Sequence, residues 1–352
     1  MSLVVSSTRK KHLTSVLKQY ALRLYNVQAY HSLYRKEAAY RVSTDKGTFC
    51  LKPFRGSFAR LSGIHKRLDD IRSSNFSSLP RWIPRKNGKY WSPQDGQFFY
   101  VTEWINGTKL GDKENDFLRL GAILARLHQS TTFSKSVSPS YTLREINRFR
   151  RMHQLFTSRL EKLNSEKREL WEWFQEHGAD CLSLAEESWN VINQGSIQRI
   201  LEEEKPSIIH GDVTRPNVIV QSANVFLIDW ELARPGSTYY EVAKTLANVT
   251  NFSVPLTKAF LSGYESVRPL SYEEWQLIVS LTRLPREAWI AARQILSGRP
   301  SVTFHVLKVT WGRRMEWVGW LDSWANLGSS RMSISISDPD QGMDADVVSL
   351  SN

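Results

Sequence analysis

The spacing of apolar residues divides this chain into a mixed N-terminal part and a largely helical remainder. An amphipathic helical pattern comes first, followed by short runs in which apolar and polar positions alternate, as in strands. After about residue 110 helical spacing prevails, broken by one hairpin-like pattern at residues 218–228. The predicted elements are helix Leu13–Tyr25, strands Asn26–Tyr30, Ala38–Thr44 and Thr48–Phe54, helix Ser57–Arg72, strand Phe98–Thr102, helix Phe117–His128 and helix Ile146–Leu163. The pattern predicts a small sheet, with the first helix packed on its back, joined to a larger helical body.

Candidate chemistry is concentrated in one short stretch of the helical part. His210, Asp212 and Asn217 stand as H-x-D-x-x-x-x-N, the spacing of the protein-kinase catalytic loop. Two apolar runs around the turn Ser222–Asn224 then predict a hairpin that returns Asp229 to the side of Asn217. Two carboxylates and an amide suit phosphoryl transfer, which needs an oriented acceptor hydroxyl and Mg²⁺ held on phosphates. The alternative is that Asp212 caps a turn and Asp229 ends a strand.

These motifs resemble the aminoglycoside phosphotransferase and choline kinase superfamily, the small-molecule relatives of protein kinases. The resemblance lies in HGD-x-x-x-x-N at residues 210–217 and IDWE at residues 228–231. Within that superfamily, the layout from about Leu13 to Trp324 resembles the spore-coat CotS-like family of sporulating Firmicutes. The other segments that carry this resemblance are Arg41–Phe54, Phe99–Leu110 and Leu120–Thr131.

The resemblance implies a fold and a division of the chain. The expected fold is a bilobal, protein-kinase-like α/β (α+β) fold with a small antiparallel sheet lobe and a larger helical lobe. Residues 1–105 would form the nucleotide-binding lobe with its leading helix, and residues 106–327 the helical lobe with the catalytic loop. Residues 328–352 are rich in Ser, Asp and Gly, which predicts a disordered tail or a partner-binding strand.

The resemblance also implies a role for each candidate side chain. Asp212 would act as the base for the acceptor hydroxyl, while Asn217 and Asp229 would bind Mg²⁺ on ATP. Asp45-Lys46-Gly47 is a hairpin turn signal, and Lys52 lies on the strand that follows it. Kinases keep a phosphate-gripping lysine on that strand. The alternative for Lys52 is an exposed lysine at a strand edge.

The resemblance also implies roles for residues outside the catalytic stretch. At the connector between the lobes, the Glu103 carbonyl and the Ile105 amide would bind the adenine edge. Glu241 would pin the catalytic loop by accepting hydrogen bonds. His210 is interpreted as a structural residue of the loop, and His128 as a hydrogen-bonded residue at a helix end in preference to a ligand.

Two features depart from the kinase pattern. Residues 28–36, between the first two strands, contain no glycine, although a backbone cradle around phosphate is easiest to build with glycine. Helix Ser57–Arg72 contains no glutamate to pair with Lys52, which leaves Asp69 and Asp70 as candidate partners. The first departure argues against a protein kinase, and both favour weak or lost catalysis.

Composition and charge limit the classes of ligand and partner that the protein is expected to bind. The 352 residues carry a net charge of +12, although the segment from Arg331 onward is acidic. A basic body suits ATP or another anion. Helix Ile146–Leu163 is the one candidate nucleic-acid surface, but its basic residues are better explained as a solvated face, with contact to substrate as the alternative. No secretory signal or membrane-length apolar run is present, so we expect a cytoplasmic protein, with the spore coat as a further location.

Tryptophan is abundant in the last third of the chain. Trp317, Trp320 and Trp324 fall on one helix face and predict an aromatic seam, with a cation-binding box as the alternative.

Two hypotheses for function remain open. The protein is either an ATP- and Mg²⁺-dependent phosphotransferase for a small hydroxylated acceptor, or a catalytically weak assembly protein that binds other spore-coat proteins.

Overall fold

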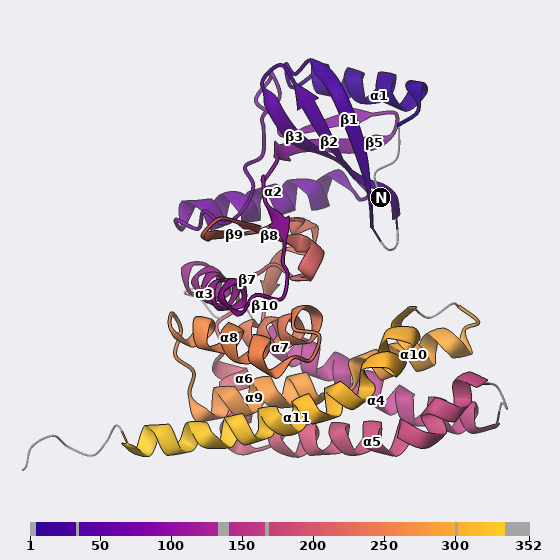
Figure 1. Cartoon of the computed structure of the whole chain (residues 1–352), viewed down its shortest axis with the longest axis vertical. Coiled ribbons are helices and arrows are strands. Elements are labelled where there is room, and N and C mark those ends of the chain that lie inside the picture. The colour runs from indigo at the N-terminus through magenta and orange to yellow at the C-terminus, as the bar shows by residue number, and fades with distance from the viewer. Residues whose placement is uncertain (1–4, 33–34, 133–140, 166–168, 300–301, 335–352) are drawn as a thin grey trace, which may run out of the picture.

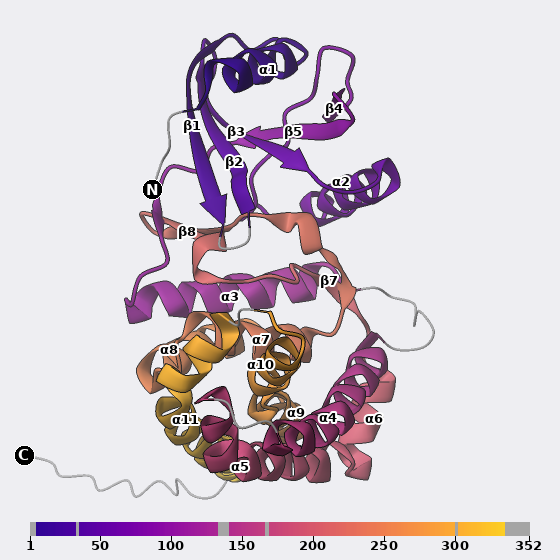
Figure 2. The ribbon, with the colours of Figure 1, turned by 90° about the vertical axis from the view of Figure 1, so that its right-hand side faces the viewer.

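A computed structural model describes residues 5–32, 35–132, 141–165, 169–299 and 302–334. It places a small sheet lobe above a larger helical lobe, with short strands between them (Figures 1 and 2). The predicted bilobal kinase-like fold is confirmed.

The N-terminal sheet has five antiparallel strands in the order β1-β2-β3-β5-β4. Each strand pairs with the next in that order, and Lys52 on β3 lies opposite Tyr100 on β5. Gly47 adopts φ +117° in the turn between β2 and β3, so the predicted hairpin is confirmed. The strands are β1 Leu24–Ser32, β2 Arg35–Thr44, β3 Gly47–Phe54, β4 Trp91–Gln94 and β5 Gln97–Glu103.

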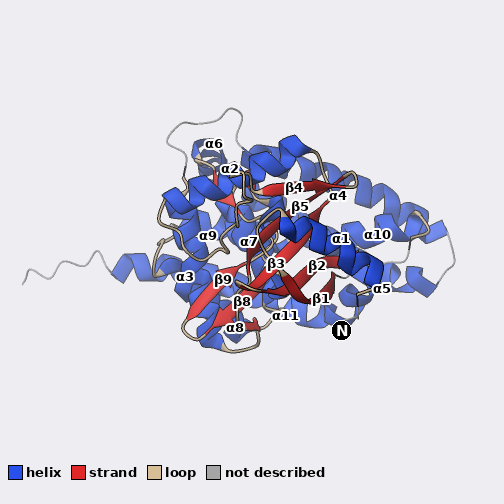
Figure 3. Ribbon diagram, turned by 90° about the horizontal axis from the view of Figure 1, so that it is seen from above, coloured by secondary structure: helices blue, strands red, loops and turns tan. Residues whose placement is uncertain are grey.

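Helix α1 (Ser7–Lys18) packs on one face of this sheet, as the sequence predicts (Figure 3). Leu13, Val16 and Leu17 are fully buried in a core shared with residues of β2, β3 and β5. The predicted end of the helix at Tyr25 is wrong. The helix stops at Lys18, and a left-handed residue, Ala21, turns the chain into β1.

The second helix, α2 (Phe58–Ser73), lies between the sheet and the short strands of the other lobe (Figure 1). Ser57 caps it by accepting a hydrogen bond from the Arg60 amide at 3.3 Å. The connector then runs from β5 through β6 (Thr108–Lys109), which pairs with β8 (Val218–Gln221) of the larger lobe.

The larger lobe consists of helices packed below the short strands that lie between the lobes (Figure 2). Where α3 crosses α8, Gly121 and Gly263 let the two backbones touch. The helices are α3 Glu114–Ser130, α4 Tyr141–Ser165, α5 Glu169–Ile192, α6 Gly195–Glu203, α7 Thr238–Val249, α8 Val254–Glu265, α9 Tyr272–Arg283, α10 Arg286–Leu296 and α11 Val302–Ile334.

Helix α4 is amphipathic, as its sequence predicts. Its buried positions include Ile146, Phe149 and Phe156, whereas Leu155, expected on the same apolar face, is 46 % exposed. On the basic side, Arg150 donates to Asn193, which follows α5. The basic residues therefore lie mainly on a solvated or helix-contacting face.

The aromatic seam forms on α11. Trp317 is fully buried and donates to the Thr257 hydroxyl at 2.8 Å, while Trp320 and Trp324 contact each other through their rings and are partly buried against the core. Helix α11 continues to Ile334, so the first residues of the predicted tail, 328–334, are helical. The rest of that tail, 335–352, lies outside the described residues.

Candidate functional site

The candidate site lies between the lobes, on short elements that run from β7 to β10. The Asn217 carbonyl accepts a hydrogen bond from the Ile228 amide at 2.9 Å, which closes the predicted hairpin beside Asn217 and Asp229. Residues 210–217 are called the catalytic loop below. The elements are β7 Ser207–Ile209, the 3-10 turn η1 Arg215–Asn217, β8 Val218–Gln221, β9 Asn224–Leu227, the 3-10 turn η2 Trp230–Leu232 and β10 Arg234–Gly236.

Asp212 and Asn217 are in direct contact. The Asn217 side-chain nitrogen donates to Oδ2 of Asp212 at 3.1 Å and to the Asp212 carbonyl at 3.0 Å. The side chain of Asp212 remains 38 % exposed. The turn η1 begins after Thr214 without a side-chain cap bond, so capping does not explain Asp212. The carboxylate is held in place yet remains open to a substrate.

Lys52 reaches from the sheet lobe to two carboxylates of the other lobe. Its Nζ lies 2.5 Å from Oδ1 of Asp229 and 3.1 Å from Oε1 of Glu231. Burial disfavours the charged amine, but the two carboxylates outweigh burial and raise the pKa of Lys52 above its ordinary value. The side chain is only 12 % exposed, so the alternative of an exposed edge lysine is wrong.

Glu231 is the partner of Lys52 that sequence reasoning missed. The candidates on α2 do not reach Lys52, because Asp69 pairs with His65 on its own helix at 3.1 Å and Asp70 is exposed. The fourth residue of the IDWE motif occupies the expected position instead. The motif itself held this signal, since Glu231 is only two residues beyond Asp229.

Tyr100 connects Glu231 to the sheet lobe. Its hydroxyl donates to Oε1 of Glu231 at 2.8 Å, and its ring stacks on Trp82 with centroids 4.2 Å apart. Tyr100 lies opposite Lys52 in the β3–β5 register, so both side chains project from one face of the sheet. Burial, together with the charge of Glu231, raises the pKa of Tyr100 well above its ordinary value. The hydroxyl therefore stays protonated and keeps donating.

The backbone of Asp229 is left-handed, with φ +66° and ψ +59°. Few residues other than glycine adopt this conformation, and it is frequent at functional sites. It occurs directly after the Ile228 amide that bonds Asn217. The hairpin therefore fixes the position of the Asp229 Cα atom, from which the side chain extends.

One face of α7 holds the backbone of the catalytic loop. Glu241 is buried and accepts two successive loop amides, at 3.1 and 2.6 Å. Lys244 donates to the Gly211 carbonyl at 2.5 Å, and Asn248 donates to the Val213 carbonyl at 3.3 Å. The predicted role of Glu241 is confirmed. Sequence reasoning missed Lys244 and Asn248, although their spacing of three and seven residues from Glu241 places them on the same helix face.

Gly211 explains why the loop departs from the protein-kinase sequence, which has arginine at this position. Its φ is +79°, and a Cβ atom there would lie 2.6 Å from the Leu232 carbonyl oxygen. Glycine is therefore required by both conformation and space.

The two candidate histidines are structural. His210 donates through Nε2 to the Ile228 carbonyl at 2.9 Å and accepts the Asp212 amide at Nδ1. Burial lowers its pKa, so the ring is neutral. His128 is buried between Tyr264 and Glu241, at 2.8 and 2.9 Å. Both interpretations made from the sequence are confirmed.

The connector places Glu103 and Ile105 between the lobes. The Glu103 amide donates to the Arg81 carbonyl at 2.9 Å, and the Glu103 carbonyl accepts the Thr102 hydroxyl at 3.2 Å. Both Glu103 and Ile105 are partly buried. Their contact with adenine stays a prediction. The glycine-free segment 28–36 falls partly outside the described residues, since positions 33 and 34 are not among them.

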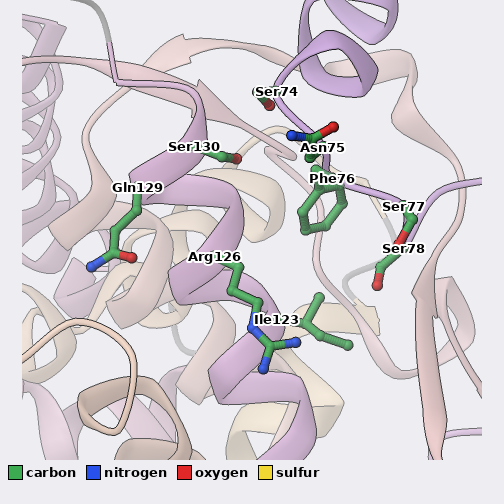
Figure 4. A pocket seen from close by; sticks show the side chains of 9 residues that line it. All are labelled: Ser74, Asn75, Phe76, Ser77, Ser78, Ile123, Arg126, Gln129 and Ser130. Carbon is green, nitrogen blue, oxygen red and sulfur yellow. The ribbon is translucent and has the colours of Figure 1, made fainter.

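A surface pocket of about 410 Å³ lies apart from the catalytic loop. Figure 4 shows Ile123 and Arg126 of α3 on one side and Phe76, from the segment after α2, facing them. None of the lining residues belongs to the catalytic loop or to the group formed by Lys52, Asp229 and Glu231, so this pocket is not part of the candidate site.

Asn217 and Asp229 form the candidate metal-binding pair. Because the Asn217 nitrogen is bonded to Asp212, its oxygen is the atom suited to a cation. Asp229 is 41 % exposed although one oxygen contacts Lys52. In the described part of the chain, no three His, Cys, Asp or Glu side chains are placed to hold a metal together. Mg²⁺ commonly takes one or two protein ligands and completes its shell with water and phosphate. The pair therefore fits Mg²⁺ bound together with a nucleotide.

A sheet lobe, a connector and a helical lobe carrying this loop define a kinase-like phosphotransferase fold. The sequence model of the phosphotransferase enzyme family (APH) matches residues 32–277, so the chain belongs to that family. No curated protein sequence gives a significant match. Within the described ranges, no helix is both long and apolar enough to span a membrane.

Solved structures share the fold over nearly the whole chain. An aminoglycoside phosphotransferase from Alicyclobacillus acidocaldarius superposes with a TM-score of 0.77 at 16 % identity, covering 93 % of this chain and 98 % of that one. The spectinomycin phosphotransferase APH(9)-Ia, solved with ADP and spectinomycin, gives 0.65 at 15 % identity and covers 91 % and 99 %. The choline kinase LicA from Streptococcus pneumoniae gives 0.51 at 16 % identity and covers 90 % and 100 %. At these identities the likeness concerns the fold alone.

Proposed function

We propose that this protein is an ATP- and Mg²⁺-dependent phosphotransferase that acts on a hydroxyl of a small metabolite or glycan-like acceptor. The observation that carries the proposal is the direct contact of Lys52, from the sheet lobe, with Asp229, 2.5 Å away on the other lobe. The hairpin brings Asn217 beside Asp229, and the Asn217 side chain in turn contacts Asp212. A spectinomycin phosphotransferase and a choline kinase share the fold, which favours a small acceptor.

In the proposed reaction each side chain has one task. Lys52 binds the α- and β-phosphates, and the backbone at Glu103 and Ile105 binds adenine. Asp212 accepts the proton of the acceptor hydroxyl as its oxygen attacks the γ-phosphorus, and ADP leaves. Asn217 and Asp229 would hold Mg²⁺, which neutralises charge that develops on the phosphate oxygens.

Nucleotide binding is expected to stabilise the protein measurably. Saturating Mg-ATP at about 100 times its dissociation constant should contribute about 2.7 kcal/mol and raise the Tm. Asn217→Ala and Asp229→Ala should reduce the shift with Mg-ATP while keeping any smaller shift with ATP in EDTA. Differential scanning fluorimetry provides the measurement. Failure of millimolar Mg-ATP to stabilise the wild type contradicts nucleotide binding, and an unchanged shift in both variants contradicts the metal assignment.

Glu231→Gln should weaken the use of ATP, because Lys52 loses one of its two carboxylate partners. We expect kcat/KM for ATP to fall about tenfold, corresponding to about 1.4 kcal/mol of transition-state stabilisation. Asp69→Asn is the matched control, since Asp69 bonds its own helix. Steady-state ADP release measures both variants. Equal losses in the two variants would show that Glu231 does not position Lys52.

A second candidate function is that of an assembly protein in the spore coat, bound to other coat proteins. It is favoured by the CotS-like layout of the sequence and by the lack of glycine in residues 28–36. In that case the fold would serve as a binding module with weak or no turnover.

A further inference from the structure

A lysine pairs with the carboxylate that would receive the acceptor hydroxyl, and two arginines carry charge that acts on this lysine. Lys244 Nζ lies 3.8 Å from Oδ1 of Asp212, with 28 % of its side chain exposed. Arg234, on β10, is 40 % exposed and pairs with Glu145 of α4 at 3.1 Å. Burial lowers the pKa of Lys244, and the charges of Arg286 and Arg234 lower it further against the opposing effect of Asp212. Lys244 is thus the cation that pairs with Asp212.

Arg286, the first residue of α10, is the least expected member of this group. It is only 8 % exposed, and its guanidinium carbon lies 5.5 Å from the ring centre of Tyr240 and 5.7 Å from that of Phe149. Its Nε is buried and, among the described residues, has no hydrogen-bond partner. An acceptor brought to this guanidinium would offset part of the cost of burying its charge.

The geometry of α7 relates Arg286 to the catalytic loop. Tyr240 and Lys244 are four residues apart and share one face of the helix. Arg286 lies on the ring of Tyr240, whereas Lys244 contacts Gly211 and approaches Asp212. Arg286 of α10 thus packs on the same face of α7 that carries Lys244, and Lys244 pairs with Asp212, the proposed base.

We infer that the acceptor is an anion, with a carboxylate or phosphate group held by Lys244 and Arg286 while Asp212 receives its hydroxyl. This inference rests on the proposed phosphotransferase function and specifies its substrate class. The acceptor oxygen forms a bond to the γ-phosphorus, the bond from that phosphorus to the β-phosphate oxygen breaks, and the hydroxyl proton passes to Asp212. Arginine and lysine bind such oxyanions through charge-assisted hydrogen bonds. A cationic acceptor would meet repulsion at the same place.

The test uses the full chain saturated with Mg²⁺ and AMP-PNP, so that an added anion cannot occupy the nucleotide site. Binding of D-glycerate, glycerol 3-phosphate, glycerol and choline is measured by calorimetry and by the change in Tm. We expect the two anions to bind and to raise the Tm more than glycerol or choline does. Glycerol or choline binding as tightly as the anions overturns the inference, and so does failure of both anions to bind. A missing shift with AMP-PNP alone contradicts the phosphotransferase proposal instead.

Substitutions of Arg286 test whether this residue binds the anionic group of the acceptor. Arg286→Met should raise the dissociation constant of the better anion about tenfold, the effect of losing one charge-assisted hydrogen bond, with the AMP-PNP shift retained. Arg286→Lys should restore part of the affinity because it keeps the charge. Arg313→Met, at an exposed position of α11, is the matched control and should bind like the wild type. Anion affinity that is equal in Arg286→Met and Arg313→Met overturns the assignment of Arg286.

Discussion

Asp212→Asn is expected to lower kcat by about 10²–10⁴-fold, the usual contribution of a positioned general base. Asparagine has the same shape, and its oxygen can still accept the bond from the Asn217 side chain, so the loop should keep its conformation. The amide cannot take up the acceptor proton. KM for ATP should change little, because Asp212 is not among the side chains that contact Lys52.

The measurement is ADP release with Mg-ATP and an acceptor identified by binding. Asp180→Asn is a suitable control, since Asp180 is also partly exposed and lies on α5 beside His177. An unchanged kcat in Asp212→Asn would contradict its role as base.

Gly263→Ala is expected to destabilise the fold by about 3 kcal/mol or more, which is at the upper end of overpacking effects. A Cβ atom at residue 263 would overlap the backbone carbonyl of Leu118, and α3 cannot yield by a side-chain rotation. The two helices would have to separate. Such separation would reach the catalytic loop, because His128 of α3 bonds both Tyr264 and Glu241.

Gly319→Ala is the matched control for this substitution. Gly319 lies within α11 and is exposed, and a Cβ atom added there would meet no described atom within 4 Å outside its own helix backbone and chain neighbours. Alanine there should stabilise by up to about 1 kcal/mol through helix propensity. Thermal and urea unfolding give both values. A Gly263→Ala variant as stable as Gly319→Ala would show that α3 and α8 do not pack as closely as described.

Local patterns were sufficient for part of the site. The spacing from His210 to Asn217 and the hairpin that follows depend on backbone geometry within about twenty residues, and the structure reproduces both. The resemblance also pointed to Glu241 as the residue that pins the loop. The end of the first helix could not be predicted in this way, because the left-handed Ala21 has no signature in the apolar pattern.

The partner of Lys52 shows where local reasoning stops. Lys52 and Asp229 are separated by 177 positions, and no spacing rule relates residues on different lobes. The sequence suggested an acid on α2, the neighbouring element along the chain, yet packing brings Glu231 to the lysine. Lys52 therefore has a second acidic partner although α2 supplies none.

The sequence by itself pointed to the fold class through its resemblance to a known family. It also indicated the catalytic loop and the candidate metal-binding pair, because those residues lie close together in the chain. Tertiary structure alone decided that Glu231 contacts Lys52, that Lys244 of α7 holds the Gly211 carbonyl, and that Arg286 lies on Tyr240. These contacts join elements far apart in sequence. Their energies depend on burial and on distances that only the packed lobes define.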